Sequence, residues 1–226
     1  MKTKSFSWLF IIICVVALLS GCSAKPETDL LECDAATMTQ FPYNENGVIV
    51  DKHQTITPVA EHPGLVKIET YYVNKGKPIT VRAYEMCRTE VEAKDSVVWS
   101  LQPSSTSGRL DWVLPVTEGF KKENYLGMNN TDYGGGIPVV DLWQKDGGVA
   151  IGLIEPVLRM ISMPVEWKRY ENKVNMSLRY EFEWPVELNT GDTLHTFTAF
   201  RYEHEGDFFN ALRTFSEVMQ KDAGIE

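Results

Sequence analysis

"VNMSLRYEFEW", residues 174–184, alternates apolar and polar side chains without a break. A period of two places six apolar side chains on one face of a β-strand and five polar ones on the other. Pro185 follows directly, and a proline cannot donate a hydrogen bond to a neighbouring strand. The stretch therefore predicts a long, half-buried strand that ends at Pro185.

Several other segments show the same strand-like composition. Residues 65–73 and 79–86 surround the turn sequence "NKGKP", which predicts a β-hairpin. Residues 96–102 and 109–116 flank "PSSTSG", which predicts a second turn. Residues 193–202 follow "NTGD" and are expected to pair antiparallel with the strand before them. Further strands are expected at 137–143, 149–155 and 158–167.

Strands at short spacing with no helical pattern between them indicate an antiparallel arrangement rather than a parallel α/β sheet. The fold class predicted for residues 41–205 is therefore all-β, a large antiparallel β-sandwich. About 200 residues are enough to bury one substantial core.

A single amphipathic helix is predicted for the last segment, residues 206–226. Phe208, Leu212, Phe215 and Met219 recur at spacings of four, three and four residues behind Asp207, a suitable N-cap. Lys221 and Gly224 supply signals for the end of the helix. Its apolar face needs a surface to cover, and we expect a following domain to begin there.

The N-terminus has the pattern of an export signal. Lys2 and Lys4 precede an apolar run that ends in "LSGC", residues 19–22, the form of a bacterial lipobox. Residues 1–21 are therefore expected to be a lipoprotein signal peptide, with lipid attached to Cys22. The alternative is a transmembrane helix, but about 12 apolar residues are too few to cross roughly 30 Å of hydrocarbon. Residues 22–40 are polar and are expected to form a tether. The expected location is the bacterial cell envelope, on the periplasmic or surface side of the outer membrane.

Charge and cysteine content limit the possible partners. The chain carries 22 basic and 31 acidic residues, for a formal net charge of −9, which disfavours binding to nucleic acid. Beyond the leader only Cys33 and Cys87 remain besides Cys22, so a cysteine-rich metal cluster is excluded. In an oxidising compartment Cys33 and Cys87 either form a disulfide or remain free, and the sequence leaves both options open.

The densest run of glycine, acidic and aromatic residues is "NNTDYGGGIPVVDLWQKDGGVAIG", residues 129–152. Its three consecutive glycines are not followed by the lysine and serine of a P-loop, so no nucleotide cofactor is expected. Glycines that bend a strand or let another chain segment approach explain the run better.

Asp132, Tyr133, Asp141 and Trp143 in this run combine carboxylates with aromatic rings. Carboxylates accept hydrogen bonds from sugar hydroxyls, and an aromatic plane covers the apolar face of a pyranose. These four residues are the predicted substrate-binding residues. The alternative is that Asp132 caps a turn and Trp143 fills the core. The four histidines are scattered, so no metal site is predicted, and they are interpreted as ordinary surface or strand residues.

The segment from "NYLGMNNTDYGGGIPVVDLW" through the long alternating strand to "GDFFNALRTFSEVMQKDAGI" resembles the N-terminal region of family 36-like bacterial α-galactosidases. In that family a β-supersandwich of the galactose-mutarotase-like kind leads through a helix into a catalytic (β/α)₈ barrel. The resemblance implies that residues 206–226 link to such a barrel, a partner in cis or in trans. The family's catalytic aspartates lie on barrel strands, so no catalytic residue is assigned in this chain.

Three functional interpretations follow from the sequence. The leading one is a lipid-anchored, non-catalytic N-terminal domain of a glycosidase that supports a barrel and contributes to its sugar-binding rim. The second is a freestanding carbohydrate-binding surface lipoprotein, and the third is a purely structural exported domain. The expected ligand in the first two is an oligo- or polysaccharide, and the expected membrane contact is through the lipid anchor.

Overall fold

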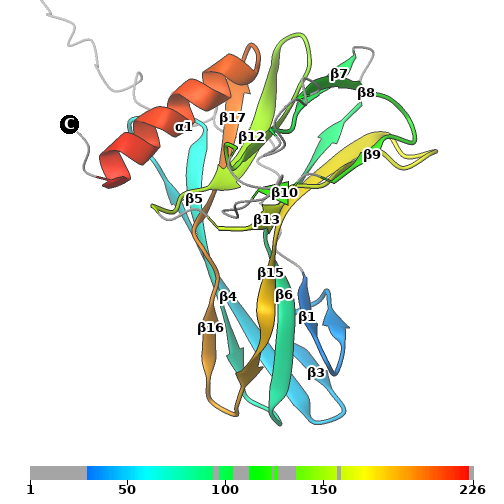
Figure 1. Ribbon diagram of the computed structural model, residues 1–226, viewed down its shortest axis with the longest axis vertical. Coiled ribbons are helices and arrows are strands. Elements are labelled where there is room, and N and C mark those ends of the chain that lie inside the picture. The colour runs from blue at the N-terminus through cyan, green and yellow to red at the C-terminus, as the bar shows by residue number, and fades with distance from the viewer. Residues whose placement is uncertain are drawn as a thin grey trace, which may run out of the picture.

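A computed structural model describes residues 30–93, 97–103, 112–123, 125–126, 136–156 and 159–223. Its described part consists of two antiparallel β-sheets and one C-terminal helix (Figure 1). The predicted all-β sandwich is confirmed. None of the helices in the described ranges is long and apolar enough to cross a membrane.

The first sheet has eight strands, and its central pair is formed by the two longest strands of the chain. Its members are β1 (Leu31–Cys33), β2 (Thr37–Met38), β6 (Ile79–Glu92), β9 (Lys121–Lys122), β10 (Tyr125–Leu126), β13 (Ile161–Ser162), β14 (Val165–Glu166) and β15 (Lys173–Leu188). The second sheet has nine strands in the order β3-β4-β5-β17-β12-β11-β7-β8, with β16 beside β5. Its members are β3 (Tyr43–Glu45), β4 (Val48–Pro58), β5 (Leu65–Asn74), β7 (Val98–Leu101), β8 (Val113–Val116), β11 (Val139–Trp143), β12 (Gly147–Leu153), β16 (Thr193–His195) and β17 (Ala199–Glu205).

The main core lies between the two sheets. Tyr72 of β5 and Tyr84 of β6 are 0% and 1% exposed and belong to one apolar cluster drawn from both sheets. The alternation in β15 works as predicted at its start, where Val174, Met176 and Leu178 are buried. At its end the pattern fails, because Trp184 is 78% exposed.

Pro185 does not end β15, contrary to the prediction. The strand continues to Leu188, and its register against β6 shifts between Glu181 and Val186. A bulge leaves a residue outside the ladder, so a proline there removes no ladder hydrogen bond. The strand expected at 158–167 is likewise divided, into the two short strands β13 and β14.

The predicted hairpin of 65–73 and 79–86 is wrong in its pairing, although both strands exist. β5 pairs with β4, β16 and β17, whereas β6 pairs with β1 and β15. The turn between β5 and β6 therefore crosses from one sheet to the other. The segment after β15 makes the same crossing, because β16 pairs with β5 and not with its predecessor. By contrast, β7 and β8 pair antiparallel as expected.

The two crossing turns meet at Asn74, which is fully buried. Its side-chain amide donates to the carbonyls of Lys77 and Leu188, at 3.0 and 2.9 Å, and its carbonyl oxygen accepts from Gly76 N–H at 3.0 Å. Its backbone also bonds to the second turn at Gly191 and Asp192. Asn74 therefore joins the turns by which the chain changes sheets.

The tether predicted for residues 22–40 is wrong in its second half. β1 pairs with β6 and β2 pairs with β1, and Leu31 and Met38 are fully buried. These strands have only three and two residues and are separated by a short polar segment, so they are too short to show an alternation of apolar and polar residues in the sequence. Residues 22–29, including the predicted lipidation site Cys22, lie outside the described part of the chain.

The helix α1 (Phe208–Ala223) begins where it was predicted. Asp207 Oδ1 accepts from Phe209 N–H at 3.1 Å, and this satisfies one of the free amides of the first turn. The helix packs on the outer face of the nine-stranded sheet, against β11, β12 and β17 (Figure 1). A second apolar cluster there joins Ala211 and Val218 to Phe200 and Ala150.

Candidate functional site

The strand β11 carries two of the four residues predicted to bind sugar, Asp141 and Trp143. It lies between β12 and β7, close to the start of α1. The other two predicted residues, Asp132 and Tyr133, lie outside the described residues.

Asp141 does not lie at the surface, which corrects its predicted role as a direct sugar ligand. Its side chain and that of His204 on β17 are both 0% exposed, and Asp141 Oδ1 lies 3.0 Å from His204 Nε2. The other ring nitrogen, Nδ1, lies 3.2 Å from the carbonyl oxygen of Glu205. Because a carbonyl can only accept, Nδ1 carries a proton, and the ionised carboxylate then calls for a second one on Nε2. This geometry is that of a buried imidazolium–carboxylate pair.

The direction of the His204 pKa supports that assignment, whereas the direction of the Asp141 pKa works against it. Burial disfavours the charged imidazolium, but the hydrogen bond and the charge of Asp141 outweigh it and raise the pKa of His204. Burial raises the pKa of the Asp141 carboxyl, and the hydrogen bond from His204 works in the opposite direction. The pair holds β11 to β17 across the intervening β12, where Gly148 leaves the space for the imidazole ring.

His204 is not among the site residues predicted from the sequence, where it is interpreted as an ordinary surface or strand residue. One signal pointed to it: "DGG" places two consecutive glycines in a strand segment, where a glycine often marks a close approach of neighbouring groups. A Cβ on Gly148 would lie 2.9 Å from His204 Nε2 and 2.6 Å from Trp143 Cβ. The sequence does not show that Gly148 of β12 lies opposite His204 of β17, so it could not identify His204 as the close neighbour.

Trp143 lies at the edge of an open cleft of about 390 Å³, which we call the aromatic cleft. Its ring centroid is 5.3 Å from that of Phe208, and Trp99 of β7 is its cross-strand neighbour. Trp143 itself is only 8% exposed, whereas Trp99 is 38% exposed. The described residues that line the aromatic cleft are Val97, Trp99, Trp143, Gln144, Lys145, Gly206 and Asp207.

The aromatic cleft has the composition expected of a sugar-binding surface. An exposed indole supplies an apolar face, and Lys145, Asp207 and Gln144 place an ammonium, a carboxylate and a carboxamide beside it. Trp143 was predicted from the sequence, but Trp99 and Asp207 were not, since β7 and the start of α1 are remote from it in sequence. Lys145 lies in the same run as Trp143 and was not selected either.

A second surface feature lies along α1. Ala211, Thr214 and Val218 face the sheet and are buried. Leu212, Phe215 and Met219, which the sequence predicted as the apolar face, are partly buried against the same cluster, and they line a groove of about 350 Å³ with Ile137 and Pro138. We call this surface the helix groove. The helix therefore has a wider apolar face than its contact with the sheet covers.

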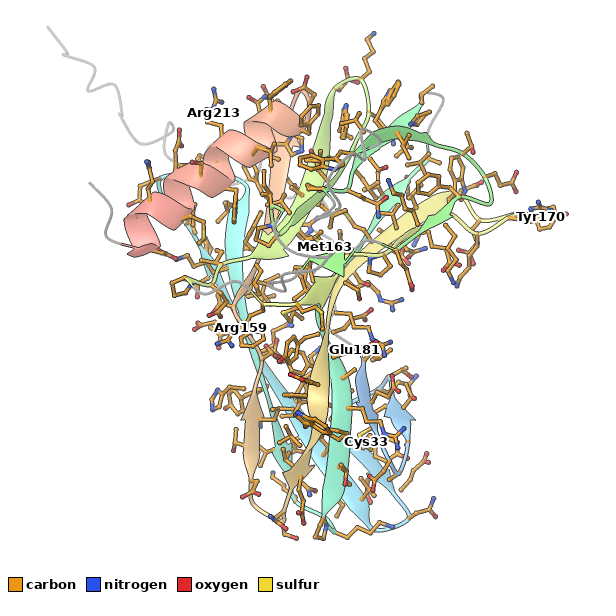
Figure 2. The ribbon with its side chains drawn as sticks, viewed as in Figure 1. Cys33, Arg159, Met163, Tyr170, Glu181 and Arg213 are labelled. Atoms are coloured by element: carbon orange, nitrogen blue, oxygen red, sulfur yellow. The ribbon has the colours of Figure 1, made fainter. Side chains whose placement is uncertain are left out.

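The two cysteines of the described region are free, which corrects the disulfide considered for Cys33 and Cys87. Cys33 lies opposite Val81 of β6, six residues along the strand from Cys87. At about 3.3 Å per residue this separation is far beyond the reach of a disulfide. Burial raises the pKa of the Cys87 thiol to about 12, so it is unreactive. Figure 2 shows Cys33 on β1.

No group of three or more histidine, cysteine, aspartate or glutamate side chains in the described ranges is arranged to hold a metal ion. No protein-family model matches the chain.

A relative and several solved structures are similar to the chain. The A type blood α-D-galactosamine galactosaminidase of Flavonifractor plautii is 23% identical over 192 residues, which cover 74% of this chain and 17% of that protein. The A355E variant of the GH36 α-galactosidase AgaA of Geobacillus stearothermophilus, in complex with 1-deoxygalactonojirimycin, superimposes with a TM-score of 0.57 at 13% identity, over 75% of this chain and 24% of that one. The galactosidase domain of the α-galactosidase-sucrose kinase AgaSK gives 0.53 at 14% identity, over 80% and 27%.

The fold is that of part of a GH36 α-galactosidase. The resemblance inferred from the sequence is thus confirmed at the level of the fold. The chain spans only about a quarter of the length of these α-galactosidases and less than a fifth of the galactosaminidase. This fold therefore accounts for most of this chain and for a minor part of each of the two α-galactosidases.

Proposed function

We propose that this chain is a non-catalytic β-supersandwich domain of an α-galactosidase-like glycosidase, which supports a catalytic (β/α)₈ barrel. The observation that carries the proposal is the coverage. Solved α-galactosidases contain this fold over 24–27% of their length, and the rest of each protein has no counterpart in this chain. The catalytic carboxylates are accordingly assigned to the barrel, in cis or in trans.

The helix groove is the proposed contact surface for the barrel. Leu212, Phe215 and Met219 are partly buried against the sheet, and the apolar surface that they leave exposed lies next to Ile137 and Pro138, just before β11. Burial of such a surface against a second domain is favourable by about 25 cal/mol for each Å² removed from water. The groove has few charged groups, with Glu155 the one acidic side chain among its described lining residues.

The proposed location is the bacterial cell envelope, with Cys22 carrying lipid. The support is the sequence pattern of residues 1–22. Treatment of the producing cells with an inhibitor of lipoprotein signal peptidase tests this proposal, because the uncleaved precursor should then accumulate. The Cys22→Ser variant should remain uncleaved without the inhibitor, and normal cleavage of that variant would contradict lipidation.

The aromatic cleft favours a second candidate function, a freestanding carbohydrate-binding lipoprotein. Trp99 and Trp143 provide the aromatic surface, and Lys145 and Asp207 provide polar groups beside it. On this alternative the chain binds oligosaccharides without a barrel, and Trp99→Ala weakens the binding.

Joining this chain to the barrel of the Geobacillus α-galactosidase, in place of the matching segment, tests the leading proposal. The chain alone should not hydrolyse an aryl α-galactoside, whereas the chimera should. Leu212→Asp in the helix groove should lower the activity of the chimera and its melting temperature, because it places a charge in the interface. Gln220→Asp, on an exposed position of the same helix, is the matched control and should change neither.

Turnover by the isolated chain that a single acid-to-amide substitution abolishes would overturn the assignment as non-catalytic. Equal effects of Leu212→Asp and Gln220→Asp on the chimera would show that the helix groove is not the contact surface.

A further inference from the structure

The turn between β14 and β15 carries an aromatic side chain that is almost fully exposed. Tyr170 is 95% exposed, the highest value for a large apolar or aromatic side chain among the described residues. Figure 2 shows Tyr170 at the outer end of this turn, pointing away from the rest of the molecule. Residues 167–171 and the adjacent turn of residues 117–120 form a projection that we call the Tyr170 tip.

Hydrogen bonds hold the backbone of the Tyr170 tip in place. Trp167 N–H donates to the carbonyl of Phe120 at 2.8 Å, which ties the two turns together. The indole N–H of Trp167 donates to the carbonyl of Glu171 at 2.7 Å, and the N–H of Tyr170 donates to the carboxylate of Glu118. Tyr170 is therefore presented from a braced turn, and a partner that binds it has less conformational entropy to remove than in a free loop.

The backbone of Tyr170 adopts a conformation that its side chain disfavours. Its φ is +68°, in the left-handed region, where a bulky side chain is unfavourable and a glycine is not. Burial does not offset this cost, because the side chain is exposed to solvent. Residues with strained backbones cluster at binding and active sites. The stability of the fold therefore does not explain a tyrosine at this position, whereas binding to a partner does.

The shape and charge of the Tyr170 tip define its partner. Small ligands bind in concavities that bury most of their surface, whereas the tip projects, so its partner is a macromolecule with a concave surface. Tyrosine is among the residues that most often fill such pockets as central anchors. Lys168 and Arg169 precede Tyr170 as exposed cations, and Glu171 is the one acidic residue of that turn. The pocket that fits should therefore combine an apolar or aromatic floor with acidic groups at its rim.

The aromatic cleft of this same chain has these features. Val97 and Trp99 supply apolar surface and are 56% and 38% exposed. Asp207 lines the cleft and Glu205 lies two residues before it, whereas Lys145 is the one cation among the described lining residues. The cleft therefore matches both the aromatic ring and the cationic neighbours of the Tyr170 tip.

We propose that Tyr170 of one copy of this chain inserts into the aromatic cleft of a second copy. No residue of the Tyr170 tip is among the described residues that line the cleft within one chain, so the contact joins two copies. The ring of Tyr170 packs against Trp99, its hydroxyl group donates to an oxygen of the lining, and Lys168 and Arg169 face the acidic rim. Because the tip and the cleft are different surfaces, the contact is heterologous, of the head-to-tail kind. The inference goes beyond the proposed function, because it requires neither a barrel nor the helix groove.

Sedimentation equilibrium of the full chain in a density-matched detergent tests the proposal. The chain should self-associate with a micromolar dissociation constant, because a contact built on one anchor is at the small end of specific interfaces, below about 1,200 Å². Tyr170→Ala and Trp99→Ala should each weaken the association by at least about 30-fold, as expected for a central aromatic anchor and its pocket. Trp184→Ala is the matched control and should change nothing, since Trp184 is another exposed aromatic side chain, on β15, and belongs to neither surface.

A mixture of the two variants tests the head-to-tail arrangement. The Tyr170→Ala chain keeps an intact cleft and the Trp99→Ala chain keeps an intact tip. Each alone should be monomeric where the unmodified chain associates, whereas the mixture should form one-to-one pairs and nothing larger. A misfolded variant would not restore pairing, so the mixture also controls for folding.

Four results would each overturn the proposal: an unmodified chain that stays monomeric through the micromolar range, association that Tyr170→Ala leaves unchanged, an equal loss with Trp184→Ala, or a mixture that forms no pairs. None of these results bears on docking of a barrel at the helix groove, which Leu212→Asp tests.

Discussion

Gly148 shows how a single residue determines the structure around the Asp141–His204 pair. A Cβ at this position would lie 2.5 Å from Leu142 O and 2.6 Å from Trp143 Cβ, as well as close to His204. Two of these neighbours are rigid, since one is backbone and the other is the first side-chain atom. The absence of a side chain is therefore what lets β11 and β17 approach across β12.

Gly148→Ala should lower the free energy of unfolding by about 1–3 kcal/mol, because the strands must shift to admit the methyl group. Urea unfolding followed by tryptophan fluorescence measures the change. Asp146→Ala, at an exposed position in the turn before β12, is the control and should have little effect. An unchanged urea midpoint for Gly148→Ala would show that the strands are not closely packed at this point.

His204 should titrate above the ordinary histidine value of 6.5, because Asp141 stabilises its charged form. Since the folded pKa is raised, the stability contributed by the protonation of His204 is fully present below pH 6.5 and is lost as the pH rises through the folded pKa. The carboxylate of Asp207 adds to this effect, and the Glu205 carbonyl accepts from the other ring nitrogen.

NMR titration of the His204 ring protons measures this pKa, with His204→Gln used to assign the resonance. Asp141→Asn should lower the midpoint, because it removes the negative charge while keeping the shape of the side chain. A midpoint below 6.5 in the unmodified chain, or no change with Asp141→Asn, would contradict the imidazolium–carboxylate assignment.

At the level of elements, the sequence predicted which segments form strands but not the sheet to which each belongs. Alternation along 65–73 and 174–184 depends only on burial of one face, which is a local property. The turn from β5 to β6 crosses between the sheets, and Asn74 in this turn bonds to Leu188, 114 residues away, a contact that no local pattern shows. The candidate site has the same limitation, because Trp143 was identified from its own segment whereas His204 and Trp99 join it only through strand register.

The helix α1 was predictable because its signals are local, and its N-cap provides a test. Asp207→Ala should lower the free energy of unfolding by about 1 kcal/mol, since the Phe209 amide loses its acceptor. Asp207→Ser keeps an oxygen at the same place and should retain most of the stability. Urea unfolding followed by the helical signal in circular dichroism distinguishes the two variants, and equal losses would show that the carboxylate contributes through its charge.

At the scale of the whole molecule, two sheets of eight and nine strands share one core, and the chain crosses between them at both turns around Asn74. This places both the aromatic cleft and the helix groove on the nine-stranded sheet. Because the turns around Asn74 join that sheet to the eight-stranded one, we expect them to matter for the stability of both sheets.

Asn74→Ala tests whether the crossings stabilise the whole fold. The substitution leaves the buried carbonyl of Leu188 without its side-chain donor and removes two further hydrogen bonds within the first turn. Each unsatisfied buried group is unfavourable by about 1–3 kcal/mol, so the total loss should exceed that of Asp207→Ala. Because the turns connect both sheets, urea unfolding should remain a single transition, with the same midpoint for tryptophan fluorescence and for circular dichroism. Two separate transitions would show instead that the sheets unfold independently and that Asn74 stabilises only its own turn.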